Sequence, residues 1–564
     1  MSKNLKRAIS MLLAVVMVLG LLPAMAFAAD TYTATLATGI PEGKDVAIYN
    51  ASGASVFASG FSGGSIVPSA AVLENGTLTV KEAVAETKGI KYAALQEALE
   101  AATNGETVTL LKDVVYGESD IVNAIGGPTG YGQYPNPSII YIGGTEGKDG
   151  AANQPSAVNA VLDLNGHSIT NNADAYLFLI MDNAKLTIKD SKNGAGIIGN
   201  SNAPVLWSTG TDTVVTIESG KYTVGDYGSL MWATHSGDLV INGGEFSTTA
   251  DDASQLIMRN EKDRQNSKFF ISGKSTVTVY GGTFHGFDPE KMYDDSKDPA
   301  YQFNAVAEGY MSKETSKNVW EVKKAVDFGM VAKIVRADKT VYFETAAAGL
   351  SAAADGETVI MIADSTEGMI YVEPEKTLDL NGKTLTASYV VAFGNGAIMD
   401  AEEGNGLLKI TSGSSRNVIL NAANGQMALY DNTDGGYRFF TMTIEIKTPT
   451  HDASINNVKF QVRPAFTNLK AYELLAAQGA SGSKIEFAID LTWEGKTSAP
   501  QRVLFVENLI VENSEYEAGG RKRAYNMNIK GVDILAGKTL TGTAVMVSET
   551  GTTVIGEAMN AEIK

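Results

Sequence analysis

Leu162–Thr170 have the sequence Leu-Asp-Leu-Asn-Gly-His-Ser-Ile-Thr, and the stretch returns at Leu378–Thr386 as Leu-Asp-Leu-Asn-Gly-Lys-Thr-Leu-Thr. The first five residues are identical, and both copies keep the alternation of apolar and polar positions. Alternation on either side of an Asn-Gly pair is typical of two short strands joined by a tight turn. A repeated strand–turn–strand unit predicts a chain built from stacked modules.

A helical pattern lies upstream of each copy. Tyr92–Val108 have apolar residues at helical spacing, then Gly105 where a C-cap glycine belongs, then the start of a strand. Phe343–Val359 repeat this arrangement. We expect each helix to cover the open end of a stack of strands, where apolar side chains would otherwise meet water.

The spacing of these landmarks predicts an insertion in the first module. The helical segments start 251 positions apart and the Leu-Asp-Leu-Asn-Gly segments 216 apart, so the first module has 35 extra residues. They fall within residues 116–157, a stretch rich in Gly, Pro, Asn and Tyr. This composition predicts a loop that projects from the stack.

Further repeats can be counted in the first module as rungs, meaning successive turns of the chain around the stack. In three segments a strand reaches a glycine bend and an aromatic residue follows two positions later: Ile217–Tyr222, Ile241–Phe246 and Val279–Phe284. Their starts lie 24 and 38 residues apart, so the second interval includes an excursion, placed at residues 260–274. A further apolar strand precedes each: Val205–Trp207, Leu230–Trp232 and Leu256–Met258. The pattern predicts a parallel β-helix with two strands per rung.

The remaining organisation follows from composition. Basic residues, an apolar run and Ala26-Phe27-Ala28 are typical of a signal peptide, so we expect cleavage after Ala28 and an extracellular or cell-surface protein. No later segment has the roughly 20 apolar residues that a membrane span needs. The predicted parts are a signal peptide (1–28), a small β region (29–88), a first module (89–325), a second module (326–440), and a region (441–564) of either further rungs or a separate β domain.

Charge and residue counts exclude several functions. The net charge of −19 opposes binding to nucleic acid or anionic lipid. The absence of cysteine excludes thiol nucleophiles, thiolate metal sites and disulfide frameworks. The four histidines are too far apart in sequence to predict a zinc site. We expect no cofactor, and Ca²⁺ is the one metal left open.

Together the export signal, the strand after a capping helix, the Leu-Asp-Leu-Asn-Gly turn and the Gly-Gly-Thr-Phe ending at Phe284 resemble a known group of proteins. These are the pectate-lyase-like, right-handed parallel β-helix repeat proteins among bacterial secreted and surface proteins of Gram-positive type. The resemblance covers residues 89–325 and 330–420. It implies an all-β, right-handed solenoid, and either an adhesin-like surface role or degradation of polysaccharide.

Catalysis would need carboxylates in a set geometry. The resemblance implies, for hydrolases of pectin, Asn-Thr-Asp followed by Asp-Asp, Ser-His-Gly and Arg-Ile-Lys motifs. This chain has Asn432-Thr433-Asp434 and Asp251-Asp252 in the reverse order, and lacks the other two motifs. A lyase would need a Ca²⁺ site and a basic residue. The carboxylates offered for Ca²⁺ lack diagnostic spacing and are more typical of solvated turns: Asp251, Asp252, Asp294, Asp295, Asp298, Asp431 and Asp434.

Binding of a glycan without cleavage needs only exposed aromatic faces with nearby polar groups. Trp207 and Trp232 are 25 residues apart at equivalent positions, so we expect them one rung apart on one face, either outward as a glycan surface or inward as core. Tyr131, Tyr134 and Tyr141 of the insertion are further candidate ligand-binding residues, and no catalytic or metal residue is predicted. The favoured function is a non-catalytic, adhesin-like scaffold that binds glycans or other surface proteins. The alternatives are an enzyme acting on acidic polysaccharide and a structural subunit of a matrix or surface layer.

Overall fold

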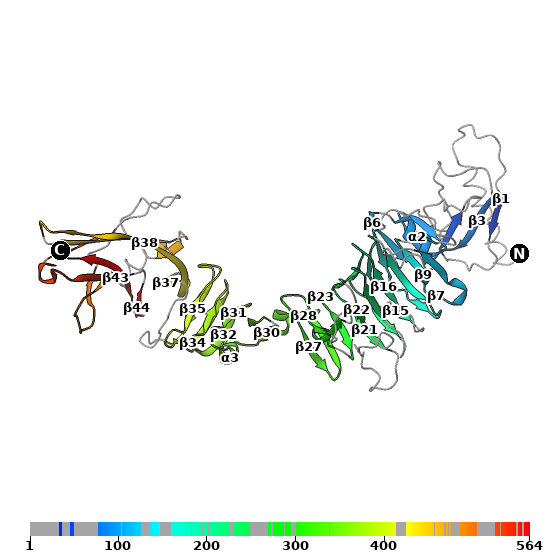
Figure 1. Cartoon of the computed structure of the whole chain (residues 1–564). Coiled ribbons are helices and arrows are strands. Elements are labelled where there is room, and N and C mark those ends of the chain that lie inside the picture. Colours follow the sequence, from blue (N-terminus) through cyan, green and yellow to red (C-terminus); the bar gives the residue numbers. More distant parts are fainter. Residues whose placement is uncertain are drawn as a thin grey trace. The chain divides into compact units, whose positions relative to one another are not determined.

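The computed structural model of the chain describes its residues with gaps, and contacts divide it into two units, 1–324 and 325–564. The described residues are 33–36, 45–49, 77–102, 104–125, 136–143, 145–146, 159–181, 183–194, 196–199, 204–224, 230–248, 269–271, 274–286, 288–294, 301–337, 339–412, 425–455, 457–466, 468, 470–471, 473–474, 486–504, 525–530, 532–548, 551–554 and 558–563. The predicted signal peptide lies outside them. The expectation of an all-β chain is confirmed, because strands dominate both units (Figure 1).

Three sheets of parallel strands form most of the first unit, and the chain visits them in turn. The β6 sheet contains β6 (Asn104–Leu110), β11 (Asn159–Asp163), β14 (Lys185–Lys189), β17 (Val214–Ile217), β20 (Asp238–Ile241) and β23 (Val277–Val279). The β7 sheet contains β7 (Val114–Tyr116), β12 (Ile169–Asn171), β15 (Gly196–Gly199), β18 (Lys221–Val224), β21 (Glu245–Thr248) and β24 (Gly282–His285). The β9 sheet contains β9 (Asn136–Ile142), β13 (Tyr176–Met181), β16 (Leu206–Thr209), β19 (Met231–Thr234) and β22 (Phe269–Ile271).

The prediction of two strands per rung is therefore wrong. Each Gly bend, such as the one at Gly220, joins strands of two different sheets, and each repeat contributes three strands, one to each sheet. Gly220 has φ of +105°, a value that glycine adopts without strain. In the third rung, β22 is the strand that pairs with β19, whereas the predicted strand Leu256–Met258 lies outside the described residues.

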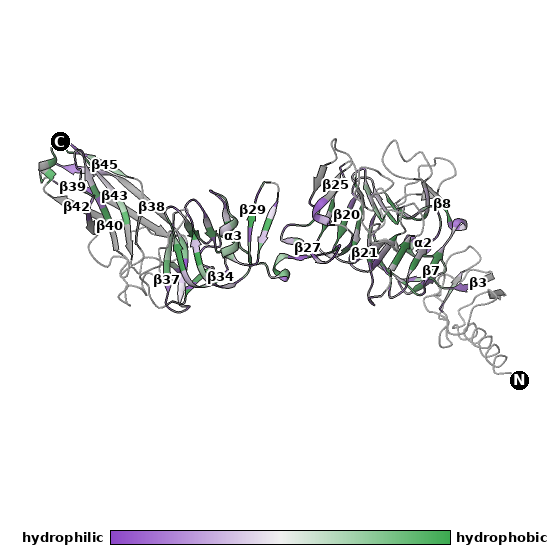
Figure 2. Cartoon of the chain, turned by 90° about the horizontal axis from the view of Figure 1, so that it is seen from below, coloured by the Kyte–Doolittle hydropathy of each residue, from purple (hydrophilic) through white to green (hydrophobic). Residues whose placement is uncertain are grey.

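A column of aromatic rings runs through the core of the first unit. Tyr222, Phe246 and Phe284 follow the three glycine bends and occupy matched positions in β18, β21 and β24. Their ring centroids are 5.2 and 4.8 Å apart with nearly parallel planes, and all three side chains are fully buried. Hydrophobic residues lie along the stacked strands, whereas the terminal hairpin strand β27 (Tyr310–Ser316) is largely hydrophilic (Figure 2).

Other elements cover the ends of the parallel sheets. Helix α2 (Leu95–Ala101) packs beside β4 (Ala85–Thr87), β5 (Ile90–Tyr92), β6 and β9. Its C-cap is Ala102, so the prediction that Gly105 caps the helix is wrong; Gly105 has φ of +79° inside β6. At the other end, β28 (Val319–Lys324) pairs antiparallel with β24 and with β27.

Short elements complete the first unit. The small N-terminal sheet has the order β1 (Thr33–Leu36), β3 (Thr77–Glu82), β2 (Val46–Tyr49). Within the predicted projecting loop, residues 116–157, the chain forms η1 (Glu118–Asp120), β8 (Val122–Ile125), β9 and β10 (Thr145–Glu146). Part of this insertion thus extends the β9 sheet instead of projecting as a loop. The remaining short elements of the first unit are η2 (Pro289–Lys291), β25 (Met292–Asp294) and β26 (Tyr301–Phe303).

The second unit begins with a shorter version of the same plan. After η3 (Ala325–Phe328), β29 (Ala332–Val335) and β30 (Thr340–Phe343), helix α3 (Ala346–Ala352) precedes two parallel sets of strands. One set is β31 (Thr358–Met361), β33 (Thr377–Asp379) and β35 (Ala397–Met399). The other is β32 (Ser365–Val372), β34 (Thr384–Ala392) and β36 (Leu407–Ile410).

The repeated turn has the same hydrogen bonds in both units. Asp163 accepts the backbone N–H groups of Asn165 and Ser191, as Asp379 accepts those of Asn381 and Ala401. One rung later, Asp190 accepts those of Gly166, Lys192 and Gly194, as Asp400 accepts those of Gly382, Glu402 and Gly406. These carboxylates connect successive rungs, which explains why the two sequences agree at the turn.

Two glutamine side chains bond to the backbone of a residue within a strand or directly after one, as a further strand would. Gln96 of α2 donates to the carbonyl oxygen of Tyr141 at 2.9 Å and accepts its N–H at 3.0 Å. Gln426 donates to the carbonyl oxygen of Asp400 and accepts its N–H, both at 2.8 Å. Each amide thus satisfies one donor and one acceptor beside a parallel sheet.

Beyond residue 425, the described strand pairs are antiparallel, so they do not continue the parallel rungs. The elements are β37 (Gln426–Asp431), β38 (Gly436–Asp452), β39 (Asn457–Phe466), β40 (Glu486–Trp493), β41 (Gln501–Leu504), β42 (Tyr525–Lys530), η5 (Val532–Leu535), β43 (Thr539–Ser548), β44 (Gly551–Val554) and β45 (Met559–Glu562). A small core that includes Phe460, Ile489 and Leu540 is formed by β39, β40, η5, β43 and β45.

Candidate functional site

Aromatic side chains gather on the outer face of the β9 sheet. Alternation along β16 and β19 directs Leu206 and Met231 into the main core, whereas Trp207 and Trp232 belong to a separate cluster. We call this cluster the aromatic face: Tyr141, Tyr176, Leu179, Met181, Trp207 and Trp232. Trp207 pairs with Trp232 in register, so the expectation that they lie one rung apart on one face is confirmed.

The rings of the aromatic face pack edge to face. Tyr176 and Trp207 have centroids 4.7 Å apart, and Trp207 and Trp232 have centroids 5.6 Å apart at 75°. Trp207 is 9 % exposed and Leu179 is fully buried, whereas Trp232, Tyr141 and Tyr176 are half-buried. The available surface is therefore that of Trp232 and the two tyrosines, with Trp207 packed beneath them.

A row of polar groups borders Trp207. Its indole Nε1 donates to Thr234 Oγ1 at 2.8 Å, and Thr234 Oγ1 donates to Thr209 Oγ1 at 3.0 Å. His235 Nδ1 lies 3.1 Å from Thr234 Oγ1. The turn after His235 is tight: a Cβ at Gly237 would lie 2.4 Å from the carbonyl oxygen of Ser208. Thr209 and Thr234 are buried, so within this row the half-buried His235 is the residue at the surface beside the aromatic face.

Three of the five candidate residues thus meet on one surface: Tyr141, Trp207 and Trp232. Tyr131 and Tyr134 lie outside the described residues. Tyr176 and His235 join this surface although the sequence interpretation did not include them. Tyr176 precedes Trp207 by 31 residues, which matches neither rung interval, so the repeat spacing did not indicate it.

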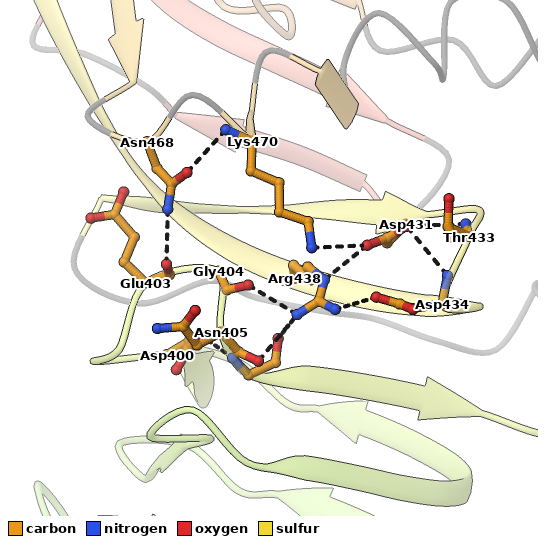
Figure 3. A network of polar contacts seen from close by, with 11 residues as sticks. Asp400, Glu403, Gly404, Asn405, Asp431, Thr433, Asp434, Arg438, Asn468 and Lys470 are labelled. Carbon is orange, nitrogen blue, oxygen red and sulfur yellow. Dashed lines mark hydrogen bonds and ion pairs between the residues drawn. The ribbon is translucent and has the colours of Figure 1, made fainter.

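The Asn432-Thr433-Asp434 motif lies beside a network around Arg438 in the second unit (Figure 3). Arg438 Nε donates to Asp431 at 2.9 Å, and its Nη2 donates to Asp434. Its Nη1 donates to the carbonyl oxygens of Gly404 and Asn405. The guanidinium therefore joins the β37–β38 hairpin to the loop before β36. It also binds the carboxylates of Asp431 and Asp434, which were considered as Ca²⁺ ligands.

The charge of Asp431 is stabilised by its neighbours. Burial alone would raise its pKa, but hydrogen bonds from Arg438 and from the N–H groups of Asp434 and Thr433, with Lys470 nearby, lower the pKa from 3.8 to about 2. Burial alone would lower the pKa of Arg438, but hydrogen bonds to Asp431 and Asp434 raise it. This pair is a structural contact rather than an acid–base couple, because both groups stay charged at neutral pH.

A pH dependence of stability follows from the lowered pKa. The contribution of ionised Asp431 is complete above about pH 4 and is lost as pH falls toward 2, a change on the order of 2 kcal/mol. We expect Asp431→Asn to lower the stability of the second unit at pH 7 and to flatten its loss between pH 4 and 2. Denaturant unfolding followed by hydrogen exchange measures this. The exposed Asp355→Asn is the control, and equal pH profiles for wild type and Asp431→Asn would contradict the assignment.

The described parts of the chain contain no group of three or more His, Asp or Glu placed to hold a metal ion. Of the loop carboxylates considered for Ca²⁺ in the first unit and interpreted as solvated turns, Asp251, Asp252, Asp295 and Asp298 lie outside the described residues, and Asp294 is in β25. None of the described helices is long and apolar enough to cross a membrane.

Comparison with known proteins gave no match, whether against family models, curated proteins or solved structures. The fold and the sites described above therefore carry the functional argument by themselves.

Proposed function

We propose that this chain is a non-catalytic, extracellular scaffold that binds glycans through the aromatic face. The observation that carries the proposal is the in-register placement of Trp207 and Trp232, with Tyr141 and Tyr176, outside the main core. Aromatic faces with a polar group at their edge are suited to sugars, whose C–H faces stack on rings and whose hydroxyls bond to polar groups. Thr209 and Thr234 are buried, so the half-buried His235 is the member of the polar row that a sugar could reach. The net charge of −19 favours a neutral or basic glycan over an acidic one.

The proposed scaffold is a right-handed parallel β-helix of the pectate-lyase-like type. Its support is the return of the chain to three parallel sheets in fixed order, and the repetition of the carboxylate turn in both units. Right-handedness is favoured because connections between parallel strands of one sheet are right-handed in about 98% of cases. Export with cleavage after Ala28 belongs to the same proposal, and the intact mass of the secreted protein tests it.

A glycan array with the mature protein, from Ala29 onward, tests the binding function. We expect binding of neutral glycans without release of reducing or unsaturated ends, with and without Ca²⁺. Trp232→Ala should weaken binding at least about tenfold, since stacked aromatic residues often dominate recognition. Tyr280→Ala removes an exposed tyrosine of the same unit outside the aromatic face and serves as the control.

Other results of this experiment would favour the alternatives. Release of unsaturated ends would indicate a lyase, and release of reducing ends a hydrolase. If the protein neither binds nor degrades any of the glycans, a structural or assembly role would be the remaining alternative. Binding that survives Trp232→Ala and Tyr176→Ala would move the site away from the aromatic face.

A further inference from the structure

The second unit presents aromatic residues that are more exposed than those of the first. Tyr371 is 43 % exposed, Phe393 46 % and Met369 57 %, and Tyr389 is half-buried. We call these four residues the platform. The Tyr371 and Phe393 rings have centroids 6.1 Å apart with planes at 22°, and Tyr389 meets Tyr371 edge on at 6.3 Å. Large apolar side chains gathered and exposed in this way commonly mark a binding surface.

The platform lies on the outer face of the β32–β34 pair. Ile370 and Val390 are paired in register and point into the core of the second unit. Their neighbours Met369 and Tyr389 are likewise paired, on the opposite face. The inward–outward alternation of β34 shifts at Ser388, between buried Ala387 and half-buried Tyr389, and Ser388 Oγ donates to the carbonyl oxygen of Gly368 at 2.7 Å. This hydrogen bond joins the two strands directly beside Met369 and Tyr389 of the platform.

The same segment of the repeat carries aromatic residues in both units. In the first unit the chain runs from the turn at Asn165 through β12 and β13 to Asp190. In the second it runs from the turn at Asn381 through β34 to Asp400. The part of β34 beyond Ser388 therefore corresponds to β13, and each begins with a tyrosine, Tyr176 or Tyr389. The platform is the counterpart of the aromatic face.

Polar groups beside the platform suit hydroxyl groups. Phe393 is followed by a turn that packs on Pro374, and the Asn395 amide oxygen accepts the N–H of Glu375 at 2.8 Å. The Glu373 side chain is 60% exposed and its carboxylate bonds to Lys376 at 2.7 Å. A carboxylate and an amide beside stacked rings are the usual groups of a sugar site. Carboxylates here, in a chain of charge −19, disfavour a polyanion.

We propose that the platform is a second glycan-binding site, which takes a neutral polysaccharide, so that one chain has two sites of the same kind. This inference rests on the proposed function for its ligand class but not on the aromatic face as a site. The two sites can be separated by experiment, because each has its own residues.

The test uses the mature protein and neutral oligosaccharides of β-1,4-glucan, β-1,3-glucan and chitin, with calorimetry to measure stoichiometry. We expect two oligosaccharides per chain, and one after the double substitution Tyr371→Ala/Phe393→Ala. Tyr430→Ala removes another exposed tyrosine of the second unit and is the control. Because the two substituted rings are exposed, the fold should persist, and circular dichroism checks this. Tyr371→Trp should retain the second site.

The outcomes distinguish this inference from the proposed function. A stoichiometry of one that is lost in Tyr371→Ala/Phe393→Ala but kept in Trp232→Ala would support the platform and remove the aromatic face. A stoichiometry unchanged by the double substitution would overturn the platform. The proposal would also be overturned if the double substitution abolished self-association in sedimentation velocity and left glycan binding unchanged. The platform would then be a contact with a second copy of the chain.

Discussion

Phe246→Ala is expected to destabilise the first unit by about 3–5 kcal/mol, the usual cost of removing a buried phenylalanine ring from a core. Phe246 is fully buried and lies between Tyr222 and Phe284, so the substitution removes two ring contacts and leaves a cavity between rungs. Stacked rings contribute beyond their buried area, by about 0.5–1.5 kcal/mol each.

Hydrogen exchange in denaturant measures this effect locally, which suits a chain of two units whose unfolding need not be two-state. Amides of β18, β21 and β24 should lose protection in Phe246→Ala while those of the second unit keep theirs. Phe246→Leu should cost less because it fills more of the cavity. Tyr280→Ala removes an exposed ring nearby and should change little. Equal protection in Phe246→Ala and Tyr280→Ala would mean that the aromatic column is not part of the core.

Asp400→Ala is expected to destabilise the second unit by about 3 kcal/mol or more. The fully buried carboxylate accepts three backbone N–H groups, from Gly382, Glu402 and Gly406, and alanine would leave them without an acceptor. Gly406 is buried and Gly382 half-buried, so these two donors are shielded from water more than that of exposed Glu402, and each unsatisfied buried donor costs about 1–3 kcal/mol. The loss should be larger than for a turn hydrogen bond at the surface, because water can enter there.

Asp364→Ala is the matched control for this substitution, since exposed Asp364 accepts one N–H, from Thr384. We expect it to cost about 0.5–1.5 kcal/mol. Asp400→Asn keeps an acceptor oxygen and should fall between the two. The denaturant midpoints of the second unit rank the stabilities of the three variants. Similar midpoints for Asp400→Ala and Asp364→Ala would contradict the role given to Asp400.

The repeated turn made much of this architecture predictable. Identical residues at Leu162 and Leu378 indicated two modules, and the interval between Trp207 and Trp232 indicated one rung. Residues at equivalent positions of successive repeats pair in register on neighbouring strands, as Trp207 pairs with Trp232, so the spacing of the repeat predicts which residues pair. The aromatic residues after the glycine bends form a column in the core for the same reason.

The number of sheets and the orientation of side chains were harder to obtain. A bend such as the one at Gly220 does not interrupt the apolar pattern, so the change of sheet is invisible in sequence. In Met369–Val372 apolar residues occupy both faces of the strand, and alternation alone does not say which face is the core. The Arg438 network joins residues more than 30 positions apart, a contact that no local pattern indicates.

The glutamine contacts described above also bear on aggregation. An open edge of a parallel sheet invites pairing with an identical edge of another molecule, the first step toward a fibre. Gln96 bonds to Tyr141 in the part of β9 beyond its pairing with β8, and Gln426 bonds to Asp400 directly after the edge strand β35. Each side-chain amide satisfies the N–H and C=O groups of one residue but does not present the row of backbone groups with which a further strand could pair. The two contacts therefore leave fewer free backbone groups near the ends of the stacked strands for another molecule to pair with.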